Sequence, residues 1–166
     1  MLVYILILIR YRVNPIFCQE RVGYKGELFE LWKFRTLIST DEIQSFPPRS
    51  NAKFLAFLRF TKLDELPQII QVISGDMSLV GPRPDLPGYA DLLQGYDRNI
   101  LSLRPGLTGL ATLKFRNEDA LLAKQDNPKT YNDQVIWPEK VRLNLYYLEH
   151  YSLGMDLDIL MKSVTK

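Results

Sequence analysis

The sequence predicts an α+β fold, a small mixed domain with a β-hairpin, several short helices and an apolar N-terminal segment. Residues 15–36 form two stretches rich in Phe, Val, Leu and Trp around a glycine-containing turn, which is typical of paired strands. Later segments place apolar residues three and four positions apart, the spacing of amphipathic helices. The chain of 166 residues is long enough for one domain, and we expect a single core.

The N-terminal apolar run is too short to cross a bilayer. Leu2–Ile9 is followed at once by Arg10 and Arg12, whereas a spanning helix needs roughly 20 apolar residues. The run also lacks the basic leader and the small-residue cleavage site of a signal peptide. Two interpretations are open: an interfacial anchor with both arginines at the lipid headgroups, or a buried strand or helix.

Composition excludes several classes of protein. A net charge of +2 and a pI near 8.6 are too mild for a typical nucleic-acid-binding domain, so we expect no nucleic-acid partner. The single Cys18 cannot form an internal disulfide, and its apolar neighbours favour a buried thiol. The sequence contains neither the G-x-G-x-x-G pattern nor a Walker loop, which argues against a Rossmann or P-loop nucleotide site.

The second predicted strand carries two cations on one face. Side chains alternate across a strand, so Phe29, Leu31, Lys33 and Arg35 share a side. Two aligned cations with apolar neighbours behind them can hold a diphosphate. The alternative is a solvated strand end with scattered charge.

The next predicted elements lead to a pair of adjacent carboxylates. Residues 39–50 are polar and predict a loop, and residues 52–60 predict a short helix that carries Arg59. A second helix is expected to begin at Leu63 and end at Gly75, with Leu66, Ile69, Ile70 and Ile73 facing the core.

Asp64 and Glu65 would fall in the first turn of that second helix. Free amide hydrogens at a helix start stabilise anions, so an ionised carboxylate and a bound phosphate are both favoured there. The pair could supply a nucleophile and a metal ligand. The alternative is helix capping, with Thr61 and Asp64 forming an approximate capping box.

Two proline-containing loops each present an arginine. Residues 77–80 predict a strand that leads into Gly81-Pro82-Arg83-Pro84, where the prolines stiffen the backbone around Arg83 for a phosphate contact. Arg104-Pro105-Gly106 predicts a type II turn. Residues 110–115 predict a strand, and residues 138–153 and 155–164 predict two closing helices.

Taken as a block, residues 61–84 resemble the signature of the bacterial sugar transferase family. The resemblance extends to three other segments: Gln19–Gly23, Lys33–Thr36 and Arg104–Gly109. The family consists of monotopic phosphoglycosyl transferases that start undecaprenyl-linked glycan assembly. The motifs occur in the family's order and at roughly its spacing, and they cover most of the chain. The resemblance implies that family members open with a longer re-entrant hydrophobic segment, and we expect Leu2–Ile9 to correspond to its second half.

The resemblance implies a reaction: transfer of a sugar 1-phosphate from a UDP-sugar to undecaprenyl phosphate, with release of UMP, at the cytoplasmic face of the bacterial inner membrane. It makes Asp64 the nucleophile of a covalent intermediate and Glu65 its catalytic partner, which holds Mg²⁺. The candidates for binding substrate phosphates are Lys33, Arg35, Arg59, Arg83 and Arg104. With the resemblance, we favour the interfacial anchor for residues 1–14, and residues 15–166 become the catalytic domain.

A rival hypothesis belongs to another class of protein. The chain could be a non-catalytic or truncated relative that binds a membrane partner or a nucleotide sugar without turnover. The short N-terminal segment motivates this reading, and the intact Asp64-Glu65 pair argues against it.

Overall fold

The computed structural model describes Ile7 and residues 14–36 and 52–165. The chain divides into two compact units. Unit 1 comprises Met1–Glu20 and Glu30–Ile73, and unit 2 comprises Arg21–Phe29 and Ser74–Lys166. The predicted loop at 39–50 lies outside the described residues, as does the predicted membrane segment at 1–14 apart from Ile7 and Asn14.

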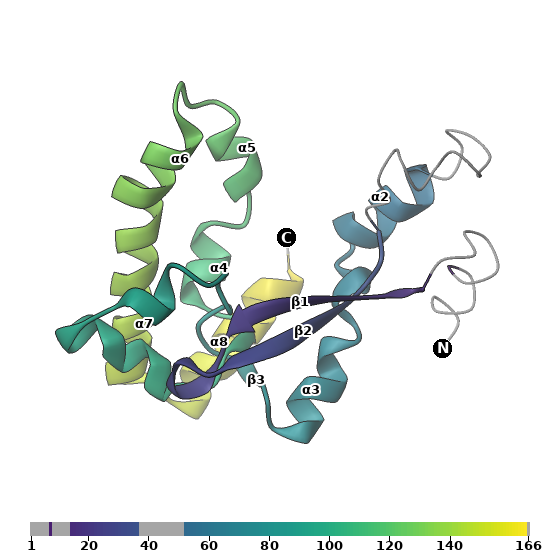
Figure 1. Ribbon diagram of the computed structural model, residues 1–166. Coiled ribbons are helices and arrows are strands. Elements are labelled where there is room, and N and C mark those ends of the chain that lie inside the picture. The colour runs from purple at the N-terminus through teal and green to yellow at the C-terminus, as the bar shows by residue number, and fades with distance from the viewer. Residues whose placement is uncertain (1–6, 8–13, 37–51, 166) are drawn as a thin grey trace. The chain divides into compact units, whose positions relative to one another are not determined.

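The predicted hairpin is confirmed. Strand β1 (Ile16–Val22) pairs with strand β2 (Leu28–Phe34), and the turn between them is the 3-10 segment η1 (Tyr24–Gly26) (Figure 1). Lys25 and Gly26 make the reversal with φ angles of 57° and 85°, and glycine adopts such angles without strain. Cys18 on β1 is exposed, so the prediction of a buried thiol was wrong.

Unit 1 places two helices and a short turn next to its part of the hairpin. Helix α2 (Ala52–Phe60) confirms the predicted helix at 52–60, and the 3-10 turn η3 (Leu63–Glu65) and helix α3 (Gln68–Ser74) follow it. Four buried apolar residues form the core of the unit: Ile7, Phe34, Leu55 and Leu58. Gly75, with φ of 89°, ends α3 at the predicted place.

The predicted orientation of α3 was wrong, although the spacing of its apolar residues is helical. Ile69, Ile70 and Ile73 are 44%, 58% and 81% exposed, whereas Gln68 and Gln71 are buried. The buried Gln71 amide accepts a hydrogen bond from Trp32 N (3.0 Å) and donates one to Glu30 O (2.6 Å), both on β2. Specific hydrogen bonds therefore decide which face of α3 is buried.

Unit 2 combines a small parallel sheet with helices. Strand β3 (Ser78–Val80) pairs with strand β4 (Gly106–Thr108), with Ser78 opposite Gly106 and Val80 opposite Thr108. The 3-10 segments η4 (Ala90–Leu92) and η5 (Gly95–Ser102) lie between these strands in the sequence. Helix α4 (Leu110–Lys114) replaces the strand predicted at 110–115, because its amides bond within a helical turn, Phe115 N to Ala111 O among them.

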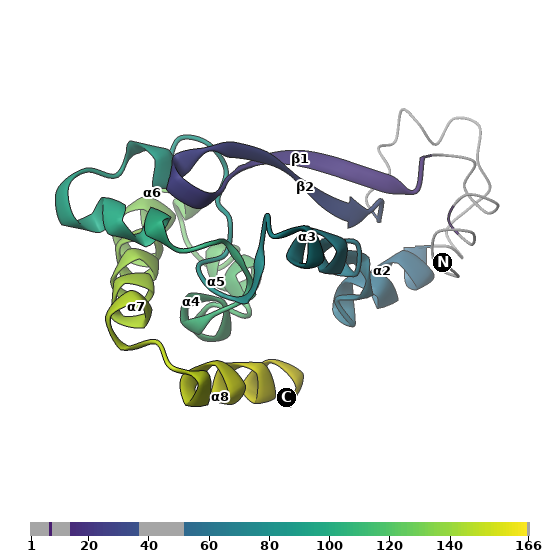
Figure 2. The same cartoon turned by 90° about the horizontal axis from the view of Figure 1, so that it is seen from below.

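The remaining helices complete this unit. They are α5 (Glu118–Leu122), α6 (Pro128–Tyr131), the π-helical turn η6 (Asn132–Ile136), α7 (Trp137–His150) and α8 (Leu153–Val164). Helix α4 packs against α7 and α8 (Figure 2). The two closing helices are thus confirmed, although α7 ends at His150 instead of residue 153 and α8 begins at Leu153 instead of residue 155.

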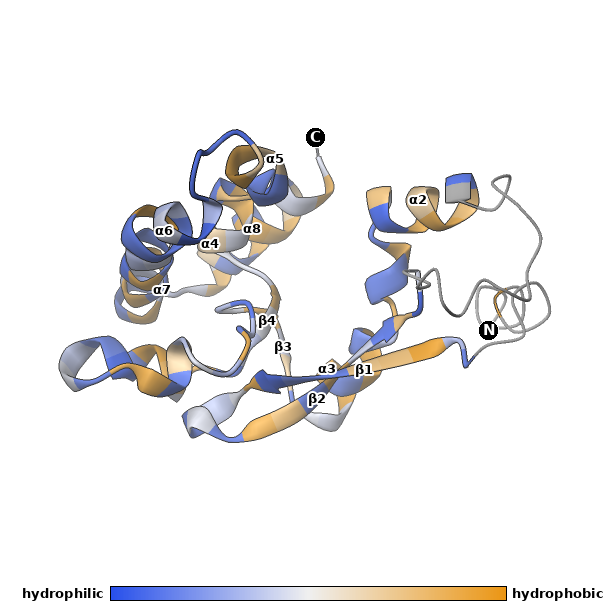
Figure 3. Ribbon diagram, turned by 45° about the horizontal axis from the view of Figure 1, so that its top comes forward, coloured by the Kyte–Doolittle hydropathy of each residue, from blue (hydrophilic) through white to orange (hydrophobic). Residues whose placement is uncertain are grey.

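Apolar packing is divided among clusters, and the expected single core was wrong for the described part of the chain. In unit 2, one cluster joins Val22 to Ile100, Leu101 and Val141, and another joins Val80, Tyr147 and Ile159. Helix α8 contains hydrophobic residues (Figure 3), and some of them, including Leu157 and Met161, are exposed. Among the described residues, no helix combines the length and the apolar composition needed to cross a bilayer.

Three glycines allow the two proline-containing loops to touch. A Cβ atom on Gly81 would collide with the backbone of Arg104, and one on Gly106 or Gly109 would collide with the backbone of Gly81. None of the three has a positive φ, so the type II turn predicted at Gly106 was wrong and its glycine is required for space instead. Close backbone contact therefore holds the Gly81-Pro82-Arg83-Pro84 segment against β4.

We expect Gly106→Ala to destabilise the protein by about 3 kcal/mol, because the added methyl must push two backbone segments apart. The control is Gly154→Ala, since Gly154 lies in α8 and a Cβ there would make only an ordinary contact with Ser152 Oγ at 3.9 Å, so alanine should be neutral or stabilising. Urea unfolding of both variants measures the difference. Equal stability of the Gly106→Ala and Gly154→Ala variants would contradict the close backbone contact between Gly106 and Gly81.

Asp85 is a carboxylate set among charged residues in unit 2. Its backbone oxygen accepts from Val22 N (3.0 Å), and the nearby Lys140 binds Glu118 (2.7 Å). Burial raises the pKa of Asp85 from 3.8 to about 6, although Lys140, Arg21 and Arg83 act in the opposite direction. The charged form is therefore disfavoured in the folded protein.

The raised pKa of Asp85 predicts a pH-dependent stability. Well below pH 4 the group is protonated in both states, and its burial costs nothing. Between about pH 4 and pH 6 the unfolded chain ionises it while the folded protein keeps the proton, so the free energy of unfolding falls across this range and the loss is complete above pH 6. We expect Asp85→Asn to remove this loss, so that the variant exceeds the wild type by about 3 kcal/mol at pH 8 and by little at pH 3.5. Urea titrations at both pH values measure the difference in the free energy of unfolding, with the exposed Asp158→Asn as control. A gain in stability that does not depend on pH would contradict the raised pKa of Asp85.

Candidate active site

Asp64 and Glu65 lie in a short turn of their own ahead of α3. Lys62 precedes them with φ of 59°, a left-handed conformation, and η3 follows at once. No side chain caps this turn, and Thr61 Oγ1 donates instead to Phe57 O at 2.8 Å. The capping interpretation is therefore wrong, and so is the placement of the pair in the first turn of an α-helix.

Glu65 forms an ion pair with Lys33 of β2. Lys33 Nζ lies 3.2 Å from Glu65 Oε1, and both side chains are largely shielded from water, at 23% and 12% exposure. Shielding strengthens the attraction because little solvent screens it. Lys33 thus brings a positive charge to the turn that holds both carboxylates.

The Asp64 carboxylate is buried, with 8% of its surface exposed. Burial, and then the negative charge of Glu65, raise the pKa of Asp64, while Lys33 and Lys62 lower it less strongly. The sequence predicted that its surroundings would favour ionisation, and this was wrong in direction. Its atom Oδ1 has no hydrogen-bond partner among the described residues, which is uncommon for a buried oxygen.

Two glutamines near this turn escaped the sequence analysis. Asp64, Gln68 and Gln71 are all buried and follow i, i+4, i+7 spacing, so they form one stripe. This is the spacing that the sequence analysis attributed to the isoleucines on the opposite stripe. A carboxylate in line with two amides was the signal that could have identified the buried face.

The other two predicted phosphate ligands of unit 1 bond to the backbone. Arg35 Nε donates to Asn14 O (3.0 Å), and the guanidinium lies 5.8 Å from the centre of the Phe17 ring. Arg59 Nη1 donates to Thr36 O (2.7 Å) at the end of α2. Of the predicted residues in this unit, the structure brings together Lys33, Asp64 and Glu65.

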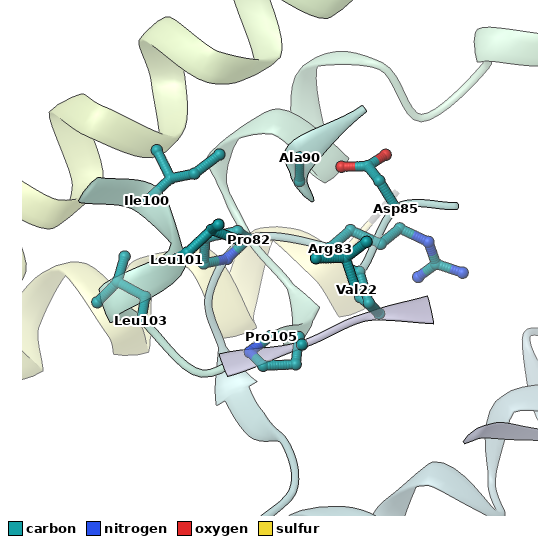
Figure 4. A pocket seen from close by; sticks show the side chains of 11 residues that line it. Val22, Pro82, Arg83, Asp85, Ala90, Ile100, Leu101, Leu103 and Pro105 are labelled. Carbon is teal, nitrogen blue, oxygen red and sulfur yellow. The ribbon is translucent and has the colours of Figure 1, made fainter. Parts of the chain in front are cut away.

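Arg83 and Arg104 belong to unit 2. Arg83 Nη1 lies 3.5 Å from Leu107 O, and Arg104 lies over the ring of Tyr24, 5.7 Å from its centre. Figure 4 shows Arg83 and Asp85 on one side of a small pocket, with Ile100 and Leu103 on the other. The pocket is therefore lined by apolar side chains on one side and by the Arg83 guanidinium on the other.

The donor set of the turn fits a magnesium ion of the kind that substrates help to bind. Mg²⁺ is commonly held by one or two carboxylates together with substrate phosphate oxygens. Asp64 and Glu65 supply two adjacent carboxylates. No three His, Cys, Asp or Glu side chains cluster as a metal site in the part of the chain that the structure describes, so a dedicated all-protein site is not seen there.

Chemically, the turn joins a buried carboxylate, a second carboxylate and a lysine. A carboxylate whose charged form is disfavoured gains from bonding to an electrophile, and the cation beside it can neutralise a phosphate. Nucleophilic attack on phosphorus is the reaction that this set of groups supports best.

Comparison with known proteins shows which family the chain resembles. A family model described as bacterial sugar transferase matches residues 1–166. The uncharacterized sugar transferase EpsL of Bacillus subtilis is 34% identical over 159 residues, which cover 92% of this chain and 70% of the relative. A UDP-glucose:undecaprenyl-phosphate glucose-1-phosphate transferase of Klebsiella pneumoniae is 34% identical over 161 residues, covering 91% of this chain and 32% of the relative.

The undecaprenyl-phosphate galactose phosphotransferase of Salmonella typhimurium is 32% identical over 172 residues. The match covers 89% of this chain and 32% of that protein. The chain thus spans about a third of the length of the Klebsiella and Salmonella relatives and most of the length of EpsL. The family match extends along the entire chain, and this chain belongs to the bacterial sugar transferase family.

Proposed function

We propose that this chain transfers a sugar 1-phosphate from a UDP-sugar to undecaprenyl phosphate, as the first membrane step of surface glycan assembly. The observation that carries the proposal is the buried Asp64 carboxylate beside the Lys33–Glu65 ion pair, in a chain that the family model matches from end to end. The names of the Klebsiella and Salmonella relatives support the general reaction.

Asp64 is the proposed nucleophile. A carboxylate oxygen forms a bond to the β-phosphorus of the UDP-sugar while the bond from that phosphorus to the bridging oxygen breaks, and UMP leaves with the electron pair. A phosphate oxygen of undecaprenyl phosphate then attacks the same phosphorus, and the bond to Asp64 breaks. The carboxylate is regenerated, and one site serves a water-soluble donor and a lipid acceptor in turn.

Glu65 is the proposed ligand of Mg²⁺, which draws negative charge from the leaving phosphate when bound. Because one lysine carries three donors, Lys33 would then bond a substrate phosphate oxygen in addition to Glu65. Arg35, Arg59, Arg83 and Arg104 remain candidates for the other phosphate contacts.

The acceptor is a membrane lipid, and unit 1 offers an apolar surface to meet it at the cytoplasmic face. Ile69, Ile70 and Ile73 project from α3 into solvent, and Phe57 and Phe60 of α2 are 54% and 70% exposed. Exposed apolar residues on short helices are typical of interfacial membrane contact. We propose that this surface, called here the α2–α3 apolar surface, rests on the bilayer.

Asp64→Asn should lower turnover by at least about 1,000-fold, because an amide cannot serve as the nucleophile. UMP release is measured with Mg²⁺, undecaprenyl phosphate and a panel of UDP-sugars, and intact-mass spectrometry of protein mixed with donor alone tests for the phosphosugar adduct. Asp158→Asn, on the exposed side of α8, is the control and should retain turnover, while EDTA should abolish it.

Two results would refute this assignment. The first is near-normal UMP release by Asp64→Asn, and the second is wild-type turnover without any adduct. A wild-type protein that binds UDP-sugar but releases no UMP with any donor would favour the non-catalytic alternative.

Membrane binding provides a separate test. We expect the protein to sediment with vesicles of anionic phospholipid, and the double variant Ile70→Asp/Ile73→Asp to bind at least about tenfold more weakly, since two charges would enter the interface. Leu92→Asp/Tyr96→Asp, exposed in unit 2, is the matched control. Equal loss in both double variants, or no binding by the wild type, would argue against the α2–α3 apolar surface.

A further inference from the structure

Two atoms near the proposed nucleophile are buried and unpaired. Asp64 Oδ1 and Gln68 Nε2 have no hydrogen-bond partner among the described residues. Gln68 is 1% exposed and Asp64 is 8% exposed. The first atom only accepts hydrogen bonds when the carboxylate is ionised, and the second only donates. They are therefore complementary.

A second buried glutamine on the same helix has hydrogen-bond partners for its side-chain amide. Gln71, on the same buried stripe, uses its amide oxygen and nitrogen to bond both Trp32 N and Glu30 O. A buried polar atom left without a bond destabilises a folded protein. The Gln68 amide thus carries a cost to folding that its neighbour does not.

The two unpaired groups lie close in the chain. Gln68 follows Asp64 by four positions, and Leu66 between them has helical φ and ψ angles of −52° and −35°. Side chains four apart along helical backbone share a face. This spacing places the donor and the acceptor on the same side of the segment that joins η3 to α3.

We propose that Gln68 is a positioning residue for Asp64, an inference that rests on the proposed function. When the UDP-sugar binds, Gln68 Nε2 donates a hydrogen bond to Oδ1 and fixes the carboxylate. Oδ2 attacks the β-phosphorus as the bond to the bridging oxygen breaks and UMP leaves. Oδ1 becomes the carbonyl oxygen of the acyl phosphate and retains the hydrogen bond from the amide.

The test compares Gln68→Met with Gln71→Met, which remove similar amides from one helix. The full chain is mixed with Mg²⁺ and UDP-glucose or UDP-galactose without acceptor, and the first-turnover release of UMP is followed by quenched flow. Thermal unfolding of the free protein is measured in parallel. Binding of donor is titrated separately, so that a loss of affinity is not mistaken for a slower step.

The proposal expects opposite signatures. Gln68→Met should slow the first turnover by about 10- to 100-fold at saturating donor, and should raise Tm by about 2–4 °C because an unpaired amide is removed. Gln71→Met should lower Tm, because Trp32 N and Glu30 O lose their partner.

Two results for Gln68→Met would overturn the positioning role and leave the proposed function intact. One is an unchanged first-turnover rate. The other is a lowered Tm together with a loss of UMP release that only matches the fraction of unfolded protein. A wild type that releases no UMP with either donor would overturn both. The stability comparison needs no substrate, so the two failures are distinguishable.

Discussion

The candidate site depends on the pair of hydrogen bonds by which the Gln71 amide joins α3 to β2. One bond reaches Trp32 N, and the next residue along the strand is Lys33, the partner of Glu65. The Gln71 side-chain amide bonds the edge of β2 as the backbone of a neighbouring strand would. Helix α3 is therefore aligned on β2 by hydrogen bonds to backbone groups and not only by apolar contact. Without that alignment, Lys33 and the two carboxylates would have no fixed separation.

Much of the fold could be predicted from the sequence, because local rules governed it. The hairpin around Gly26, the helix at 52–60 and the end of α3 at Gly75 depend on turn geometry and helical spacing, which short windows of sequence contain. The proposed catalytic pair, Asp64 and Glu65, was identified from its adjacent carboxylates and from the family resemblance. Residues 110–115 were misassigned because a short apolar run does not distinguish a strand from a buried helix.

The orientation of α3 could not be predicted from hydropathy. A hydrophobic stripe is expected to face the core, yet here two amides and a carboxylate are buried and the isoleucines are exposed. Long-range partners such as Glu30 O are invisible to a local pattern, and so is the close approach of Gly81 to Gly106. The direction of the Asp64 pKa shift was missed for the same reason, since desolvation depends on the packing around the whole turn.

The inverted helix α3 has a consequence for how a lipid could be used. The apolar side of α3 and the carboxylates of η3 lie on one segment of chain, and a helix of seven residues is only about 10 Å long. If that side rests on a bilayer, the proposed nucleophile Asp64 is held at headgroup depth. The polyprenyl tail could then stay dissolved among the acyl chains throughout catalysis, and the protein would need no tunnel to accommodate it.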